Sequence, residues 1–310
     1  MSSAQKDAEA LRKAMKGLGT DEAAIIKIIA NRTNEQRQKI KVTYKASYGR
    51  DLIEDLKSEL HGNFEDATVA LFDTPVEYDV NQLKKAMKGA GTDEDTLIEI
   101  ICSRPNWLLK KIKEEYKKKF GKELEKDVAS ETGGDLKRLF ISLLQFNRSE
   151  NAHPNDAECQ KKAKEILDAG EGKWGTDESV FDKYFTMGSP MELALIAKHY
   201  HKLTGHTILQ AIEKEFSGDM KKLLTWIVYA IISPSEYYAT RVNKAIKGWG
   251  TNDNLLIRVL VTRDEIDMPQ IKQYYKQLYG KDMLADIKSD CSEDYQKLPI
   301  EPAGHQTELF

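Results

Sequence analysis

Several features that often define a protein are scarce in this chain of 310 residues. It has three cysteines, which are too few and too widely separated for a disulfide framework or a zinc site. Its longest apolar runs, such as Leu224 to Ile232, are far shorter than the ~20 residues that span a bilayer. The first residues lack the apolar core of a signal peptide and the glycine that myristoylation needs after Met1. We therefore expect a cytosolic protein.

The chain also lacks a large excess of charge of either sign. Its 47 basic and 50 acidic side chains give a formal net charge of -3. A nucleic-acid binder would usually concentrate basic residues on one surface, and a protein held to anionic lipid by lysine alone would carry a polybasic cluster. The strongest basic run, Lys117 to Lys119, lies among acids in EEYKKKFGKELEKD. We expect no nucleic-acid partner, and contact with an anionic surface would need positive charge from another source.

What the chain does contain is one glycine-rich segment repeated four times. The copies read KGLGTDE (16–22), KGAGTDE (88–94), GKWGTDE (172–178) and KGWGTND (247–253). Their threonines are separated by 72, 84 and 75 residues and are Thr20, Thr92, Thr176 and Thr251. An aromatic residue follows each threonine after 24 residues, a glycine after 29 and an acid after 39; the acids are Glu59, Glu131, Glu215 and Asp290. Because no insertion interrupts this span in any copy, the sequence has a true internal repeat.

The apolar residues within each copy are spaced as in helices. In the first copy we predict a helix ended by Gly17 and a second helix capped by Thr20. A third helix is predicted to begin with a capping box at Thr33 to Gln36 and to end at Gly49. Two further helices are predicted over about 51–60 and from Phe64 onward. With no convincing strand, the sequence predicts an all-α protein of four repeats, each with five short helices.

The predicted organisation follows the repeats. We assign residues 4–73, 76–145, 159–232 and 235–298 to repeats 1 to 4, with a linker at 146–158 and a tail at 299–310. The linker is polar, contains Pro154 and is expected to be an exposed connection between two halves. Pro299 is expected to truncate the last helix and to begin a disordered tail. Because a repeat of about 70 residues is marginally stable alone, we expect buried contacts between repeats.

The repeated loop and its distant acid together suit a hard cation. Glycines let the backbone turn through positive φ and direct carbonyl oxygens outward, and a carboxylate from another helix end could add two oxygens. Ca²⁺ takes about 6–8 oxygens, so water or a lipid phosphate would complete the shell, with weak affinity on the order of 10⁻⁵–10⁻³ M. Taken singly, such a loop is more often a helix cap and such an acid a solvated side chain. Their joint recurrence in one register favours a paired site.

This fourfold pattern resembles the annexin core over about residues 4–298. The resemblance implies a slightly curved disc with calcium loops on its convex face, and reversible calcium-dependent binding to anionic phospholipid at the inner face of membranes. It leaves self-association on membranes open. The implied calcium ligands are the loop carbonyls and the acids of the four repeats: Met15, Gly17, Gly19 and Glu59; Met87, Gly89, Gly91 and Glu131; Glu171, Lys173, Gly175 and Glu215; and Ile246, Gly248, Gly250 and Asp290.

Some details of the resemblance set individual repeats apart. Minor calcium sites are implied at Thr20 with Glu22 and at Thr92 with Glu94. Lys173 replaces a loop glycine, which disfavours positive φ in the third repeat. The family usually has an arginine at the position of Met187; the other repeats keep it as Arg32, Arg104 and Arg263.

Two loops carry a tryptophan beside the glycines. Trp174 and Trp249 would suit the headgroup region of a membrane, where an aromatic ring with a polar edge is stable. The alternative is that each ring packs against its own repeat. Several weak calcium loops on one face would bind a membrane with high avidity, because each later contact is intramolecular.

Enzyme functions are disfavoured by the sequence. It contains no H-E-x-x-H, no G-x-x-x-x-G-K-[ST], no G-x-S-x-G and no EF-hand loop. A calcium-dependent lipid hydrolase and a calcium-regulated scaffold for a protein partner remain as alternatives. A lipid-turnover assay separates the first from a binder, and co-sedimentation with vesicles or with lipid-free cytosol separates the second.

Overall fold

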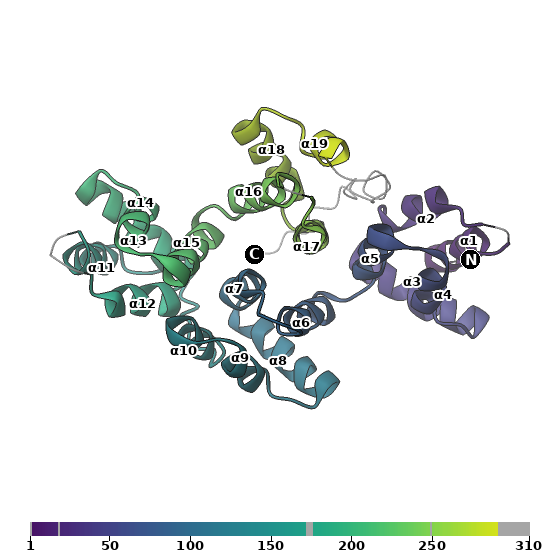
Figure 1. Cartoon of the computed structure of the whole chain (residues 1–310), viewed down its shortest axis with the longest axis horizontal. Helices are drawn as coiled ribbons and strands as arrows, with labels where there is room; N and C mark the ends of the chain where they lie inside the picture. The colour runs from purple at the N-terminus through teal and green to yellow at the C-terminus, as the bar shows by residue number, and fades with distance from the viewer. Residues whose placement is uncertain (1, 18, 172–175, 249, 291–310) are drawn as a thin grey trace. The chain divides into compact units, whose positions relative to one another are not determined.

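A computed structural model of the chain describes residues 2–17, 19–171, 176–248 and 250–290, without the side chain of Asp290. Within these residues the protein is entirely helical, with elements α1 to α19 and no strand, as predicted (Figure 1). The predicted end of the last helix and the tail lie outside the described residues.

The helices follow the four repeats. Repeat 1 contains α1 (Ser3–Ala14), α2 (Glu22–Ile29), α3 (Asn34–Tyr48), α4 (Leu52–Glu59) and α5 (Gly62–Leu71). Repeat 2 contains α6 (Pro75–Ala86), α7 (Glu94–Ser103), α8 (Asn106–Phe120), α9 (Leu124–Glu131) and α10 (Gly134–Leu143). Repeat 3 contains α11 (Asp156–Ala169), α12 (Glu178–Met187), α13 (Pro190–Thr204), α14 (Ile208–Glu215) and α15 (Gly218–Ile232). The described part of repeat 4 contains α16 (Pro234–Ile246), α17 (Asp253–Arg263), α18 (Met268–Tyr279) and α19 (Met283–Asp290).

The third helix of repeat 1 begins and ends as the sequence predicts. The hydroxyl of Thr33 accepts from the backbone N–H of Gln36, whose side chain accepts from the backbone of Thr33 in return. Gly49 ends the helix in the left-handed conformation, with φ of 66°, which glycine adopts at little cost.

The predicted cap of the second helix was wrong. The N-cap of α2 is Asp21, whose carboxylate accepts from the backbone N–H of Ala24 at 3.0 Å. The same position caps the second helix of the other repeats, through Asp93, Asp177 and Asn252. A carboxylate or amide at this position leaves the preceding threonine hydroxyl available for another partner.

The chain divides into two compact units. Unit 1 combines repeats 1 and 4, and unit 2 runs from Val76 to Pro234 and combines repeats 2 and 3. The stretch 146–158, which we expected between two halves, therefore lies inside unit 2, where it connects α10 to α11.

In unit 1, repeats 1 and 4 are joined through a buried arginine. Arg37 on α3 is 2% exposed. Its guanidinium donates to the carbonyl of Ile29 at 3.1 Å and to the carboxylate of Asp264 at 3.1 Å. The helices α5 and α17 also pack against each other. These contacts confirm the expectation of buried contacts between repeats, because Asp264 neutralises a charge that would be costly to bury alone.

In unit 2 the connection between repeats is also an arginine. Arg148, in the stretch after α10, donates to the carbonyl of Cys102 at the end of α7 and to the carbonyl of Thr186 on α12. Burial lowers the pKa of the Arg148 guanidinium. This part of the linker is therefore packed between two helix ends rather than fully exposed, and the partial negative charge of those ends suits a cation.

A buried tyrosine ties the third helix to the fourth in three of the repeats. The hydroxyls of Tyr44, Tyr116 and Tyr275 donate to aspartates on α4, α9 and α19 at 2.6–2.7 Å; the aspartates are Asp55, Asp127 and Asp286. Each aspartate also pairs with two basic side chains, which in repeat 1 are Arg12 and Arg50. The hydrogen bond from Arg50 lowers the pKa of Asp55. Burial of the Tyr44 hydroxyl, together with its hydrogen bond to Asp55, raises the pKa of Tyr44 to about 12.

One acid at the junction of repeats 2 and 3 is poorly compensated. Asp182 lies on α12, which packs against α10, and its Oδ1 atom is buried with no hydrogen-bond partner among the described residues. Burial, with the nearby charge of Asp135, raises the pKa of Asp182 to about 6, against the opposing effect of Arg138. Glu178 on the same helix also favours the protonated form.

We predict that Asp182→Asn raises the melting temperature at pH 7 and flattens its change with pH between about 6 and 4. The folded pKa lies above the ordinary value of about 3.9, so the folded state binds the proton more tightly. Asp182 therefore adds stability as pH falls through this range and loses it as pH rises. Thermal unfolding at several pH values measures this, with exposed Asp168→Asn on α11 as the control. An unchanged pH profile in the Asp182 variant would contradict the assignment.

Candidate calcium loops

Each candidate loop connects the first and second helices of a repeat, and one backbone hydrogen bond closes it. In repeats 1, 2 and 4 the backbone N–H of the residue after the loop threonine donates to the carbonyl of the residue six positions before that threonine. The donors and acceptors are Asp21 and Ala14, Asp93 and Ala86, and Asn252 and Ala245, at 2.8–2.9 Å. In repeat 3, Asp177 donates instead to Ala169 at 2.7 Å, seven residues before Thr176. The segment between donor and acceptor is thus one residue longer in repeat 3 than in the other repeats.

The glycines of the first two loops adopt the conformations predicted for them. Gly17 and Gly19 have φ of 128° and 86°, and Gly89 and Gly91 have 110° and 96°. A Cβ atom at any of these four positions would meet nothing within 4 Å, so glycine is required by conformation and not by space. In the fourth loop Gly250 has φ of 86°, whereas Gly248 is not in the left-handed region.

The carbonyl oxygens of these loops are available to a ligand. Hydrogen bonds between described residues leave unused the carbonyls of both complete sets, Met15, Gly17 and Gly19, and Met87, Gly89 and Gly91. The side chains of Met15 and Met87 are buried, at 5% and 8% exposed. These residues therefore anchor the end of the first helix with an apolar side chain while the backbone faces the loop.

The acid expected at each loop does reach it in three repeats. The hydroxyl of each loop threonine donates to a carboxylate 39 residues later: Thr20 to Glu59 at 2.8 Å, Thr92 to Glu131 at 3.3 Å, and Thr176 to Glu215 at 2.6 Å. Glu59 and Glu215 are half-buried and Glu131 is exposed. Loop and carboxylate therefore meet in space, and calcium ligation by them stays a prediction.

Part of the predicted set lies outside the described residues. This holds for Lys173, Trp174, Gly175 and Trp249, and for the side chain of Asp290. In the fourth repeat the described ligand candidates are the backbones of Ile246, which ends α16, and of Gly248 and Gly250, which follow it.

The third repeat differs from the others in a way that the sequence analysis missed. Its buried tyrosine, Tyr200, donates to Glu171 at 2.7 Å rather than to an aspartate of the fourth helix. Lys214 also donates to Glu171 at 3.1 Å, and His206 lies 3.6 Å from it. The hydrogen bond from Tyr200 lowers the pKa of Glu171. Ala211, in the place of Asp55, Asp127 and Asp286, is the signal that could have revealed the change.

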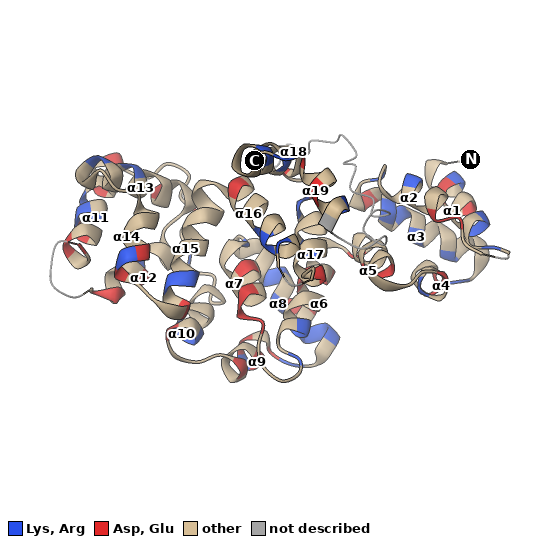
Figure 2. Cartoon of the chain, turned by 45° about the horizontal axis from the view of Figure 1, so that its top comes forward, with Lys and Arg blue, Asp and Glu red and all other residues tan. Residues whose placement is uncertain are grey.

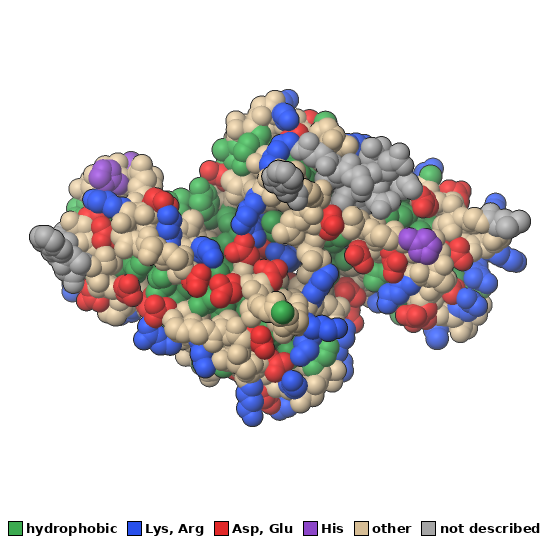
Figure 3. Space-filling model, viewed as in Figure 1, with side chains coloured by type: hydrophobic (Ala, Val, Ile, Leu, Met, Phe, Trp, Pro, Cys, Tyr) green, Lys and Arg blue, Asp and Glu red, His purple; other side chains and the backbone are tan. Residues whose placement is uncertain are grey.

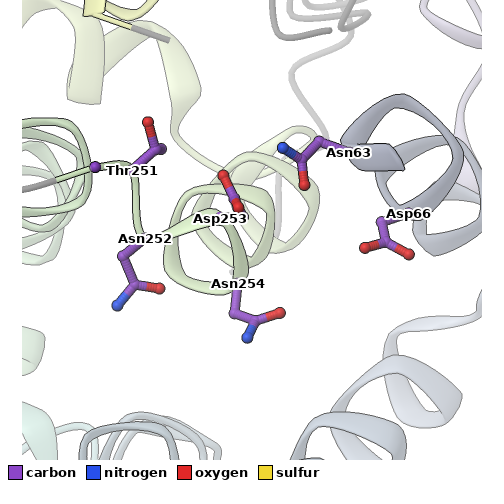
Figure 4. Close-up of a pocket in the computed structure, with 7 residues that line it drawn as sticks. Asn63, Asp66, Thr251, Asn252, Asp253 and Asn254 are labelled. Atoms are coloured by element: carbon purple, nitrogen blue, oxygen red, sulfur yellow. The ribbon is translucent and has the colours of Figure 1, made fainter. Parts of the chain in front are cut away.

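A polar pocket lies in unit 1 between the start of α5 and the fourth loop. Asn63 and Asp66 line it from α5, and Gly250 to Asn254 line it from the loop and the start of α17 (Figure 4). Asn252 also caps α17, by accepting from the backbone N–H of Leu255 at 3.1 Å. The pocket adds carboxylate and amide oxygens to the surroundings of this loop.

Charge is mixed around the loops. Acidic residues occupy the start of α7, directly after the second loop (Figure 2). On the face shown in Figure 3, acidic and basic side chains are intermixed. The lysine run on α8 is compensated as expected, with Lys117 paired with Glu123 and Lys118 with Glu115.

Two further observations concern the described residues as a whole. Their His, Cys, Asp and Glu side chains form no group of three or more arranged to hold a metal ion. None of their helices combines the length and the apolar character needed to cross a bilayer.

We predict that Gly89→Ala and Gly91→Ala each lower the free energy of unfolding by about 1 kcal/mol, because alanine is strained at positive φ. Chemical denaturation measures the effect. Gly133→Ala is the matched control, since its site is equally open and its φ of -131° suits alanine. Equal losses in all three variants would contradict a conformational requirement in the loop.

Comparison with known proteins matches this architecture. The annexin family model matches residues 6–71, 78–143, 161–227 and 237–300. Human annexin A7 is 46% identical over 299 residues, which cover 96% of this chain and 61% of the relative. Human annexin A13 is 46% identical over 295 residues, covering 95% and 93%. The structure of calcium-bound annexin (Sm)1 superposes with a TM-score of 0.87 at 33% identity, covering 99% of this chain and 91% of that one.

The fold and the matches define an all-α protein of four homologous repeats, with a loop threonine hydrogen-bonded to a distant carboxylate in each of the first three. The chain belongs to the annexin family. It spans about three fifths of the length of relatives such as annexin A7 and nearly all of annexin A13.

Proposed function

We propose that this protein binds anionic phospholipid membranes reversibly when calcium rises, as a peripheral cytoplasmic protein without enzymatic activity. Membership of the annexin family supports calcium-dependent phospholipid binding in general terms. The observation that carries the proposal for this chain is the hydrogen bond from a loop threonine to a distant carboxylate in three repeats. In the first two repeats, that bond places an anionic oxygen beside the predicted ligand carbonyls, which have no hydrogen-bond partner among the described residues.

The donor set fits Ca²⁺ better than a transition metal. Main-chain carbonyls and a single carboxylate are hard oxygen ligands, and no imidazole or thiol is among the predicted ligands. The solved structure of annexin (Sm)1 is described as calcium-bound, which supports the same ion here. Bound calcium would supply positive charge at the loop and leave part of its shell to phosphate oxygens.

The residues of the chain would perform two tasks in this process. The left-handed glycines hold the carbonyls in place before the ion arrives, which reduces the entropy lost on binding. The threonine hydroxyl holds the carboxylate at the loop while leaving its other oxygen free to ligate. Because each loop has only one carboxylate, we propose that several weak sites act together to bind a membrane with high avidity.

We predict that Glu59→Gln and Glu131→Gln each raise the calcium concentration for half-maximal vesicle binding roughly threefold to tenfold, because each removes one charged ligand. Asp290→Asn is expected to act in the same direction. Co-sedimentation with phosphatidylserine vesicles across a calcium titration measures the midpoint. The matched control is Glu35→Gln, which removes an exposed acid paired with Lys39 away from the loops. If the three loop variants combined leave the midpoint unchanged, the proposed sites are wrong.

The two loop tryptophans test the membrane-facing part of the proposal. We predict that calcium and anionic vesicles together shift the emission of Trp174 and Trp249 to the blue, and that brominated lipid quenches it. Replacing either with phenylalanine leaves the other as the one loop tryptophan, and Trp226, 6% exposed on α15, provides an internal signal that lipid should not quench. Absence of quenching from both loop residues in vesicle-bound protein would place the membrane-binding surface elsewhere.

A further inference from the structure

The junction between repeats 2 and 3 carries exposed apolar side chains. Trp107 is the second residue of α8 and is 57% exposed, and Met191 is the second residue of α13 and is 54% exposed. Met187, the last residue of α12, is 38% exposed. Large apolar side chains gathered at one exposed place are typical of a surface that contacts another molecule.

Trp107 and Met191 occupy the same position in their repeats, 15 residues after the loop threonine. Repeat 4 has Ile266 there, which is 50% exposed. Repeat 1 has Glu35 instead, an exposed acid paired with Lys39. Because repeat 1 folds with a charged residue at this position, packing within the repeat does not account for the exposed Trp107 and Met191.

One peptide group, between Arg148 and Ser149, brings the two repeats together at this surface. Its carbonyl accepts from the side-chain amide of Asn106, the residue before Trp107, at 2.9 Å. Its N–H donates to the carbonyl of Met187 at 2.8 Å. Because one planar group makes both bonds, the start of α8 and the end of α12 lie side by side, and α13 begins three residues later. The three apolar side chains therefore belong to one region of the surface of unit 2.

Two lysines place positive charge beside the tryptophan. Nζ of Lys111 lies over the ring of Trp107, 5.2 Å from its centroid, and Nζ of Lys110 lies 5.6 Å from the centroid of the Phe146 ring. Three other lysines of α8 form ion pairs, but no carboxylate among the described residues pairs with Lys110 or Lys111. Their ammonium groups therefore remain available to an acidic partner.

The exposed acids of this region lie farther from the tryptophan. Glu114 is two helical turns beyond Trp107 on α8, about 10 Å along the axis. Glu150 follows the peptide group that binds Met187. Glu192, next to Met191, is paired with Lys162. The surface is thus cationic at α8 and apolar toward α13.

This combination suits a protein segment better than a nucleic acid. Tryptophan and methionine are common at the centres of protein interfaces, and methionine adapts its shape to a partner. Single-stranded nucleic acid would need an open aromatic face for stacking, and Lys111 already lies over the ring of Trp107. The two lysines favour acidic side chains next to the apolar residues of the partner.

The surface is also separated from the candidate calcium loops by the second helix of each repeat. α7 begins directly after the second loop and ends at Ser103, just before α8; its ten residues span about 15 Å. α12 begins two residues after Thr176 and ends at Met187. A membrane held by the loops would therefore leave this surface open.

We propose that Trp107, Lys110, Lys111, Met187 and Met191 form a docking surface for an acidic amphipathic segment of a partner protein. The apolar side chains contact the apolar face of the segment, and the two lysines pair with its acids. Binding there needs no calcium, and it leaves the loops able to hold a membrane at the same time. The proposal does not rest on calcium binding by the loops.

The test uses a fluorescein-labelled synthetic peptide of glutamate and leucine, with leucine spaced as on one face of a helix. Fluorescence anisotropy during titration with the full chain in EDTA measures its binding. The comparison probes are a scrambled peptide of the same composition and a labelled single-stranded oligothymidylate. We expect the amphipathic peptide to bind about tenfold more tightly than either probe.

Two variants test the two parts of the surface. Trp107→Glu with Met191→Glu introduces the residue of repeat 1 at both positions and should weaken peptide binding about tenfold. Lys110→Ala with Lys111→Ala should weaken it and reduce its dependence on salt. The matched control is Val42→Ser with Lys45→Ala, which removes an exposed apolar residue and an exposed lysine from α3. Thermal unfolding should show the same melting temperature in all three variants, because every replaced side chain is exposed.

Co-sedimentation with phosphatidylserine vesicles and calcium tests simultaneous binding, and the labelled peptide should sediment only when the protein is present. Peptide binding that the two surface variants leave unchanged, or equal binding of the scrambled peptide, overturns the proposal. Preference for the oligothymidylate would assign the surface to nucleic acid instead and also overturns it. Because peptide binding is measured in EDTA, failure of the protein to bind vesicles would contradict only the membrane proposal.

Discussion

The hydrogen bond between a loop threonine and a carboxylate 39 residues later is the interaction on which the functional interpretation depends. It joins the start of the second helix to the end of the fourth. Without it, the glycine loop would be an ordinary connection and the acid a solvated side chain at a helix end. The bond also explains the capping of the second helix: Asp21 caps α2, and Thr20 serves the carboxylate of Glu59.

A second interaction, from a buried tyrosine to an acid, supports the first. In repeats 1, 2 and 4 it holds the third helix against the fourth. In repeats 1 and 2 the end of that fourth helix carries the carboxylate that reaches the loop. The acid there comes from the fourth helix and not from the loop. In the third repeat the loop provides the acid through Glu171, so the same packing requirement now acts on the loop.

Much of the fold could be predicted from local pattern. The helical spacing of apolar residues, the capping box at Thr33 and the left-handed glycine at Gly49 are short-range features, and each was confirmed. The division into units was not predictable in the same way. Repeats 1 and 4 pack together through Arg37 and Asp264, which are 227 residues apart, and a single copy of the repeat does not show which neighbour it will contact.

The sequence by itself determined the number of repeats, their helical character and the fixed spacing of loop and acid, because these follow from residue identity along the chain. Only the tertiary structure decided which oxygen meets which hydroxyl. Three threonines reach their predicted acids, yet Tyr200 reaches Glu171 because Ala211 offers no carboxylate and a buried hydroxyl needs an acceptor. A hydrogen-bond requirement is fixed by a residue, but the partner that meets it is fixed by packing.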